Sequence, residues 1–150
     1  MITMLQNTVA LLARILLSFI FIASGLNHIW NWGGTIKLMT AKGMAMESAL
    51  GSVGAVVVHF LLVLAVTFLL LGGLSILLGI RARAGAVLLV AFLIPATLIF
   101  HDFWVDKTQM INFMKNTSIM GGVLMVLAFG SGRFGVDSLL AKKRVELRDN

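Results

Sequence analysis

Residues 53–100 read VGAVVVHFLLVLAVTFLLLGGLSILLGIRARAGAVLLVAFLIPATLIF. Within them, neither residues 53–80 nor residues 84–100 contain a lysine, arginine, aspartate or glutamate. A helix that crosses the hydrocarbon core of a bilayer needs about 20 mostly apolar residues. Because only a short basic turn with Arg81 and Arg83 separates the two stretches, the sequence predicts a hairpin of two membrane-spanning helices.

Two further stretches are long and apolar enough to span a membrane. The first carries Arg14 as its only formal charge, and the last carries Lys115 near its start. Glycine and serine at 130–132 end the last stretch. We therefore predict four transmembrane helices, at about residues 8–29, 53–80, 84–101 and 110–130.

The composition agrees with this prediction, because 59% of the 150 residues are apolar and only 12% are charged, which excludes a soluble globule. Four spans use roughly 80 residues and leave the rest for loops and tails. The fold class is thus predicted to be all-α: one domain over residues 1–150, built as an integral membrane four-helix bundle. With no cysteine in the chain, disulfides and dithiol relays are excluded, so any redox chemistry needs a bound cofactor or a partner.

The distribution of lysine and arginine predicts the orientation. The Arg81/Arg83 turn and the tail at 133–150 fall on the side of the N-terminus, and that tail holds five further basic residues. By the positive-inside rule both termini lie in the cytoplasm, which makes the chain a multi-pass protein of the inner (plasma) membrane. Because the basic residues follow this topology, the net charge of +6 does not indicate nucleic-acid binding.

Two segments outside the spans are predicted to lie along the membrane surface. Residues 32–50 are too polar to span but carry several apolar side chains, and we expect a short amphipathic helix or a re-entrant loop in the first outer loop. Residues 136–147 are expected to form an amphipathic helix in the cytoplasmic tail, on the inner headgroups.

The predicted topology gathers titratable and polar groups near the outer face: His28, His59, His101, Lys115 and Asn116. Histidine, lysine and asparagine side chains can hydrogen-bond the carbonyls of a quinone and exchange protons with it. Three histidines could instead ligate a metal ion, and a pair could ligate haem iron, although no known metal-binding spacing is present. A purely structural role for these interfacial groups is the remaining interpretation.

Arg14 is costly within a span, at about 2.5–3.5 kcal/mol near a helix centre. We expect an ion pair with Asp137, the acid that follows the last span on the same side, which would tie the first helix to the end of the fourth. Snorkelling of the guanidinium to the headgroups is the alternative.

Three segments resemble the DoxX family of small four-helix bacterial membrane proteins: LLARILLSFIFIASGLNHI at 11–29, LIFHDFW at 98–104 and NFMKNTSIMGGVLMVLAFGSGRFGVD at 112–137. The resemblance covers nearly the whole chain. It points to Arg14, His101, Lys115, Asn116 and Asp137, whereas His28 stands where family members often have lysine.

The family takes its name from a membrane component of a terminal quinol oxidase, and other members are implicated as partners of redox-defence enzymes. The resemblance therefore implies a membrane subunit or partner of a quinone-linked redox system, with other redox subunits or a second copy of the chain as partners. No self-contained catalytic motif is present. The alternatives are a non-catalytic membrane scaffold or assembly protein, and a small-molecule transporter, for which four short helices without a repeat leave little room.

Overall fold

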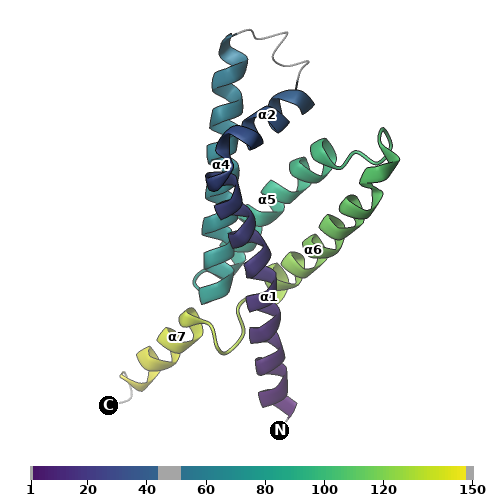
Figure 1. Ribbon diagram of the computed structural model, residues 1–150. Helices are drawn as coiled ribbons and strands as arrows, with labels where there is room; N and C mark the ends of the chain where they lie inside the picture. The colour runs from purple at the N-terminus through teal and green to yellow at the C-terminus, as the bar shows by residue number, and fades with distance from the viewer. Residues whose placement is uncertain (1, 44–51, 148–150) are drawn as a thin grey trace.

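The computed structural model describes residues 2–43 and 52–147, and within them the chain is helical and contains no strand. Four helices are long and apolar enough to cross a membrane, which confirms the predicted number of spans (Figure 1). Two shorter α-helices and one 3-10 turn complete the described fold. In chain order the elements are α1 (Ile2–Trp30), α2 (Trp32–Lys42), α4 (Ser52–Leu78), α5 (Ala82–Phe100), η1 (Lys107–Gln109), α6 (Met110–Phe129) and α7 (Val136–Glu146).

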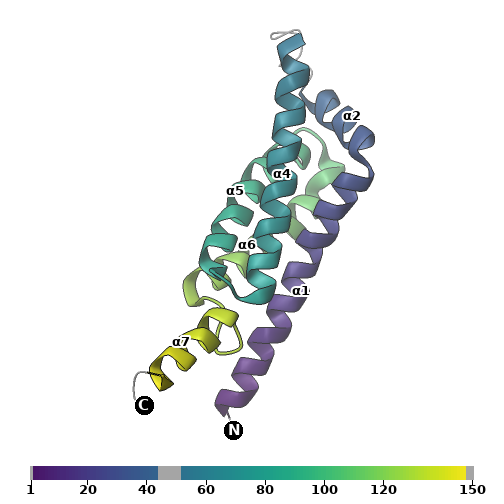
Figure 2. The ribbon, with the colours of Figure 1, turned by 90° about the vertical axis from the view of Figure 1, so that its left-hand side faces the viewer.

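The helix boundaries agree with the predicted spans to within two residues, except at the start of α1. This helix begins at Ile2 instead of residue 8, and its 29 residues make it about 43 Å long. The hydrocarbon core of a bilayer is only about 30 Å thick. The first turns of α1 accordingly extend past the neighbouring helices, as Figure 2 shows.

The long helices form a sequential bundle in which α1 packs on α4, α4 on α5 and α5 on α6. In both views the N-terminus and α7 lie at one end of the bundle, which we call the terminal end (Figures 1 and 2). The opposite end carries α2 and is called the α2 end. The α5–α6 pair crosses the α1–α4 pair at a wide angle in Figure 1, so α1 and α6 meet over only a short length.

Each long helix buries one stripe of side chains and leaves the rest of its apolar surface exposed, as expected of helices that face lipid. On α1 the buried stripe includes Arg14, Ser18, Phe21 and Gly25. Residues three and four apart share one face of a helix, and this spacing continues through the core. The remaining core includes Leu62, Leu69 and Ile76 of α4, Ala86, Leu89 and Leu93 of α5, and Val123 and Val126 of α6.

The helices α4 and α5 approach each other closely at Gly72 and Gly85. A Cβ atom added to Gly72 would lie 2.9 Å from the carbonyl oxygen of Gly85, and one added to Gly85 would lie 2.9 Å from the carbonyl oxygen of Gly72. Small residues at such contacts let two membrane helices pack backbone against backbone. The predicted hairpin is therefore held by glycines on both of its helices.

Arg14 caps the end of α4 and does not contact Asp137, so the predicted ion pair was wrong. Its guanidinium donates to the carbonyl oxygens of Ile76 (2.9 Å), Leu77 (2.8 Å) and Ser131 (2.6 Å). The last carbonyls of a helix have no intrahelical donor and carry the negative end of the helix dipole, which makes a buried cation there favourable. Arg14 is only 3% exposed, so its side chain does not snorkel to the surface either.

Asp137, in the first turn of α7, holds the turn that follows α4. Its carboxylate accepts a hydrogen bond of 2.6 Å from the backbone N–H of Arg81, and its own N–H donates to Gly79 O at 3.3 Å. Arg81 has a positive φ of 46°, an unfavourable conformation for a residue with a side chain. Arg14 thus binds the end of α4 and Asp137 binds the adjoining turn, without contact between the two side chains.

Both predicted surface segments are helical where the structure describes them. The helix α2 lies within residues 32–50, of which 44–50 are outside the described residues. The helix α7 matches the segment predicted at 136–147 to within one residue. In Figure 1, α2 runs obliquely beside the upper part of α4.

Candidate functional site

A cavity of about 320 Å³ lies between the helices toward the α2 end. Five helices contribute to its walls, which are mainly apolar and aromatic. Small-molecule sites in proteins occupy about 300–1,000 Å³ and combine apolar walls with a few polar groups, so this cavity is a candidate binding site. Its lining consists of Ile20, Phe21, Ser24 and His28 of α1, Thr35, Leu38 and Met39 of α2, Leu62, Ala65 and Leu69 of α4, Phe92, Leu93, Ala96 and Phe100 of α5, His101, and Asn116 and Ile119 of α6.

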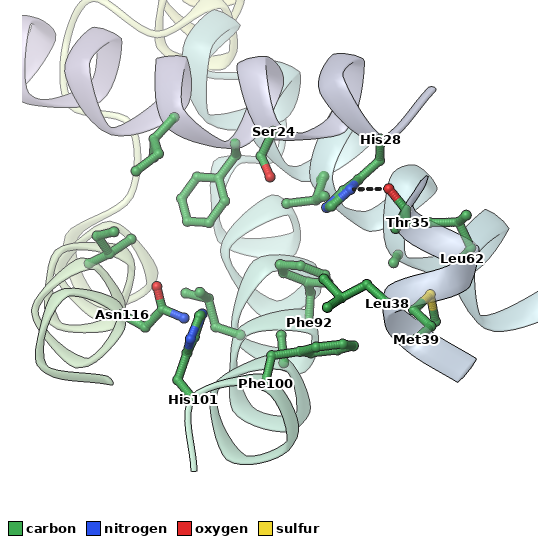
Figure 3. A pocket seen from close by; sticks show the side chains of 17 residues that line it. Ser24, His28, Thr35, Leu38, Met39, Leu62, Phe92, Phe100, His101 and Asn116 are labelled. Carbon is green, nitrogen blue, oxygen red and sulfur yellow. Dashed lines mark hydrogen bonds between the residues drawn. The ribbon is translucent and has the colours of Figure 1, made fainter. Parts of the chain in front are cut away.

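The polar groups stand on two sides of the apolar lining, as Figure 3 shows. His28 and Thr35 form one pair, at the junction of α1 and α2. His101 and Asn116 form the other, where the end of α5 meets α6. The aromatic rings of Phe92 and Phe100 lie between the two pairs. A flat ligand with polar atoms at opposite edges would fit this arrangement.

The hydrogen bonds of His28 assign its tautomer. Its Nδ1 lies 3.3 Å from the hydroxyl oxygen of Thr35, and that hydroxyl donates its only proton to the carbonyl oxygen of Asn31, at 3.0 Å. The contact with Thr35 therefore requires a proton on Nδ1 of His28. In the neutral ring Nε2 then carries a lone pair and acts as a hydrogen-bond acceptor.

His101 has the same tautomer for a different reason. Its Nδ1 lies 3.0 Å from Oε1 of Gln109, which also accepts a 3.2 Å bond from the side-chain amide of Asn112. An amide oxygen only accepts, so Nδ1 of His101 carries the proton and Nε2 is again the acceptor. The cavity thus has an acceptor nitrogen on each side.

Asn116 is placed by a hydrogen bond to α5. Its Nδ2 donates to the hydroxyl of Thr97 at 3.1 Å, and the Thr97 side chain is buried. Among the described residues the amide oxygen of Asn116 has no hydrogen-bond partner, which leaves it available to a ligand. Asn116 therefore adds a third acceptor to the cavity.

The structure brings three of the five predicted site residues together, but His59 is not among them. The face of α4 that packs inward carries Val58 and Leu62, and His59 lies about 100° around the helix from Val58. Its side chain is exposed, and its Nδ1 contacts the carbonyl oxygen of Ala55 at 2.9 Å. The predicted convergence of three histidines was therefore wrong.

Lys115 is also absent from the cavity, because adjacent helical residues cannot face the same way. Asn116 points inward with Ile119 and Val123, at the spacing of one helix face, and Lys115 is exposed. The prediction that Lys115 joins the cluster was wrong for this reason. Within residues 2–43 and 52–147, no three histidine, aspartate or glutamate side chains gather closely enough to form a metal site.

An ion pair beside the cavity links the end of α2 to the segment that follows α5. Nζ of Lys42, the last residue of α2, lies 2.9 Å from Oδ1 of Asp102, which directly follows His101. The hydrogen bond from Lys42 lowers the pKa of the Asp102 carboxyl below its ordinary value. Because Thr35, Leu38 and Met39 of the same helix line the cavity, this pair holds α2 across it.

The Lys42–Asp102 pair should weaken in acid. A lowered folded-state pKa means that the contribution is complete above the ordinary aspartate pKa of 3.8 and is lost as the pH falls through the lowered value. The variant D102N is expected to reproduce the loss at neutral pH, seen as faster amide hydrogen exchange in α2. The control K37Q changes an exposed lysine of the same helix and should leave exchange unchanged; equal exchange in D102N and the native chain would contradict the role of the pair.

These features define a polytopic α-helical membrane protein with a small cavity inside the bundle. Comparison with known proteins assigns the family: the model of the DoxX family matches residues 9–102, and the chain belongs to that family. The inner membrane protein YqjF of Escherichia coli K12 is 32% identical over 139 residues, which cover 93% of this chain and 97% of YqjF. The inner membrane protein YphA of the same organism is 32% identical over 133 residues, covering 85% of this chain and 86% of YphA.

No solved structure matches the chain. The two relatives and the four candidate spans identify it as a multi-pass protein of the inner membrane. The family match ends at residue 102, so α6 and Asn116 lie outside it, but an alignment over 93% of the chain extends past that point. The cavity therefore includes residues that the family match alone would miss.

Proposed function

We propose that the chain is a membrane subunit or partner of a quinone-linked redox system, and that its cavity binds the quinone headgroup. The observation that carries this proposal is the cavity itself: aromatic walls between two imidazoles whose Nε2 atoms both accept hydrogen bonds. A quinone headgroup is a flat apolar ring with one oxygen at each of two opposite edges. It fits the two-sided arrangement better than a ligand with a single polar end.

The tautomers of His28 and His101 favour binding of the reduced headgroup, the hydroquinone. A hydroquinone donates two O–H groups, whereas a quinone only accepts, and two acceptor nitrogens match the former. Oxidation of a hydroquinone to a quinone releases two protons and two electrons. Each Nε2 can take up one proton, and since the chain contains neither cysteine nor tyrosine, the electrons pass to a redox group of a partner subunit.

Binding of a decyl-substituted benzoquinone in both redox states, by the chain in lipid nanodiscs, tests the proposal. We expect the hydroquinone to bind more tightly than the quinone. The variants H101L and N116L should each weaken hydroquinone binding by about tenfold, because one hydrogen bond contributes roughly 1–1.5 kcal/mol and 1.4 kcal/mol is a factor of ten. Isothermal titration calorimetry or quenching of tryptophan fluorescence would give the affinities.

The variant H59L is the matched control, because it makes the same change at a histidine outside the cavity. Hydroquinone binding by H59L should equal that of the native chain. No measurable binding in either redox state, or an equal loss in H59L and H101L, would contradict the proposal. The absorbance and metal content of the purified chain would show whether haem or a metal ion occupies the cavity instead.

The proposal places the cavity in the outer half of the membrane. The terminal end carries Arg81, Arg83 and Arg133 together with the basic tail, and the described part of the α2 end carries fewer basic residues. By the positive-inside rule the termini are cytoplasmic. Labelling of single introduced cysteines from either side of the membrane tests this orientation directly, since the native chain has none.

A scaffold or assembly role is the second candidate, and the exposed face of α6 favours it. Of the most apolar stretch of α6 only 11% is buried within the chain, the smallest share among the four spans. Lys115 is exposed on this helix, about 8 Å along the axis from its first residue. A chain that binds no quinone but is purified with a partner, or as a homo-oligomer, through α6 would support this second role.

A further inference from the structure

We infer that Gln109 is a positioning residue that fixes which ring nitrogen His101 offers to the cavity. This inference rests on the proposed function only in assigning a use to that nitrogen. Gln109 does not line the cavity, and it lies in the short segment between α5 and α6. The segment therefore acts on a ligand through His101 alone.

Gln109 contacts His101 directly. The amide oxygen of Gln109 accepts from Nδ1 of His101 at 3.0 Å and from the amide of Asn112 at 3.2 Å. Because Asn112 also donates, this end of the Gln109 side chain is the oxygen and not the NH₂ group. Free neutral histidine favours a proton on Nε2, so the contact with Gln109 reverses the intrinsic preference of the ring.

The segment that carries Gln109 is held by Asp106. Asp106 is the N-cap of η1, and its Oδ1 accepts from the backbone N–H of Thr108 at 3.0 Å and from the Thr108 hydroxyl at 2.7 Å. The hydroxyl and the N–H of Thr108 lower the pKa of Asp106. The backbone N–H of Gln109 donates to the carbonyl oxygen of Asp106 at 3.0 Å, so the turn that Asp106 caps holds Gln109 beside His101.

The charged groups near His101 do not provide another partner for Nδ1. Asp102 follows His101 in the chain but is paired with Lys42 of α2. Lys107 of η1 lies over the ring of Phe103, with its Nζ 5.9 Å from the centroid. His28 of α1 lines the same cavity and is bonded to Thr35. Gln109 is thus the group that sets the proton on Nδ1.

The ¹⁵N chemical shifts of the imidazole nitrogens, measured on the ligand-free full chain in nanodiscs, test the inference. In the native chain we expect His101 to show a protonated Nδ1 and an unprotonated Nε2. The variant Q109L should move the proton to Nε2 in most molecules. The matched control Q6L makes the same change at the other glutamine of the chain, which is exposed on α1, and should leave His101 unchanged.

A second variant separates positioning from folding. In Q109E the new carboxylate still accepts from Nδ1 of His101, so His101 should keep the native tautomer that Q109L loses. A native chain with the proton on Nε2, or a Q109L chain with the native tautomer, would overturn the inference. Unchanged His28 signals in Q109L would show that the bundle is intact. Because no ligand is present, these outcomes are independent of whether the cavity binds quinone.

In nanodiscs, Q109L should also lower the preference for decyl-hydroquinone over decyl-quinone, because the ring would then donate to the ligand. We expect hydroquinone binding to weaken about tenfold, as for the loss of one hydrogen bond. Q109E should keep the native preference. A native tautomer without the native preference would leave the positioning role intact and contradict only its use for this ligand.

Discussion

The variant R14M is expected to lower the free energy of unfolding by about 3 kcal/mol or more. The substitution leaves the carbonyls of Ile76, Leu77 and Ser131 without the guanidinium, and each buried acceptor that loses its donor costs about 1–3 kcal/mol. It also removes the cation from the negative end of the α4 dipole. Reversible unfolding in mixed micelles, followed by circular dichroism, would measure the change.

The variant R83M is the matched control for this effect. Arg83 is exposed and makes one long hydrogen bond, at 3.3 Å, to the carbonyl oxygen of Ala128. Its loss should cost less than about 1 kcal/mol. The variant R14K should fall between R14M and the native chain, because one ammonium replaces three placed donors. Similar losses in R14M and R83M would contradict the capping role, and so would a rescue of R14D by D137R, because the two side chains do not touch.

The variant G85A is expected to destabilise the bundle, although alanine is the better helix former. Its new Cβ would lie 2.5 Å from the Ser75 hydroxyl and 2.9 Å from the carbonyl oxygen of Gly72, and the backbone oxygen cannot move without separating α4 from α5. Overpacking of this kind costs typically 1–3 kcal/mol. The helical preference of alanine returns only about 1 kcal/mol. Thermal unfolding in detergent would show a lower midpoint.

The variant G121A is expected to change stability in the opposite direction to G85A. Gly121 lies on α6, and a Cβ added there would have no other atom within 4 Å, so the substitution meets open space. Helix propensity alone should then raise stability by up to about 1 kcal/mol. A lower unfolding midpoint for G121A than for G85A would contradict the conclusion that Gly72 and Gly85 are needed for the close packing of α4 and α5. G72A, on the facing helix, should behave like G85A.

The sequence predicted the spans well because lipid requires a long apolar stretch, whatever the packing. The start of α1 was missed because Gln6 and Asn7 precede the apolar run, and the overhang at the terminal end tolerates such polar side chains. The partners of Arg14 were missed for a different reason. Its acceptors are main-chain carbonyls, which every residue has, so the residue types at 76, 77 and 131 do not indicate them.

The site was predicted less completely than the fold. The candidate residues were chosen by their depth in the membrane, without regard to which face of each helix they occupy. His59 lies at the predicted end of α4 but on the exposed side of that helix. Lys115 and Asn116 are adjacent, so only one of them faces the cavity, and the inward spacing of Asn116 with Ile119 and Val123 could have identified which. Gln109 and Thr35 act through hydrogen bonds to histidines seven or eight residues away, across helix ends whose geometry the sequence does not specify.

The sequence separation of the Arg14 partners bears on how the protein is made. The arginine leaves the ribosome before its acceptors, which follow it in the chain by 62, 63 and 117 residues. The first helix is therefore synthesised before any of these acceptors, and the last acceptor follows α6 in the chain. Completion of the cap thus depends on the segment after α6, and a product truncated before Ser131 would present quality-control proteases with an incompletely bonded arginine.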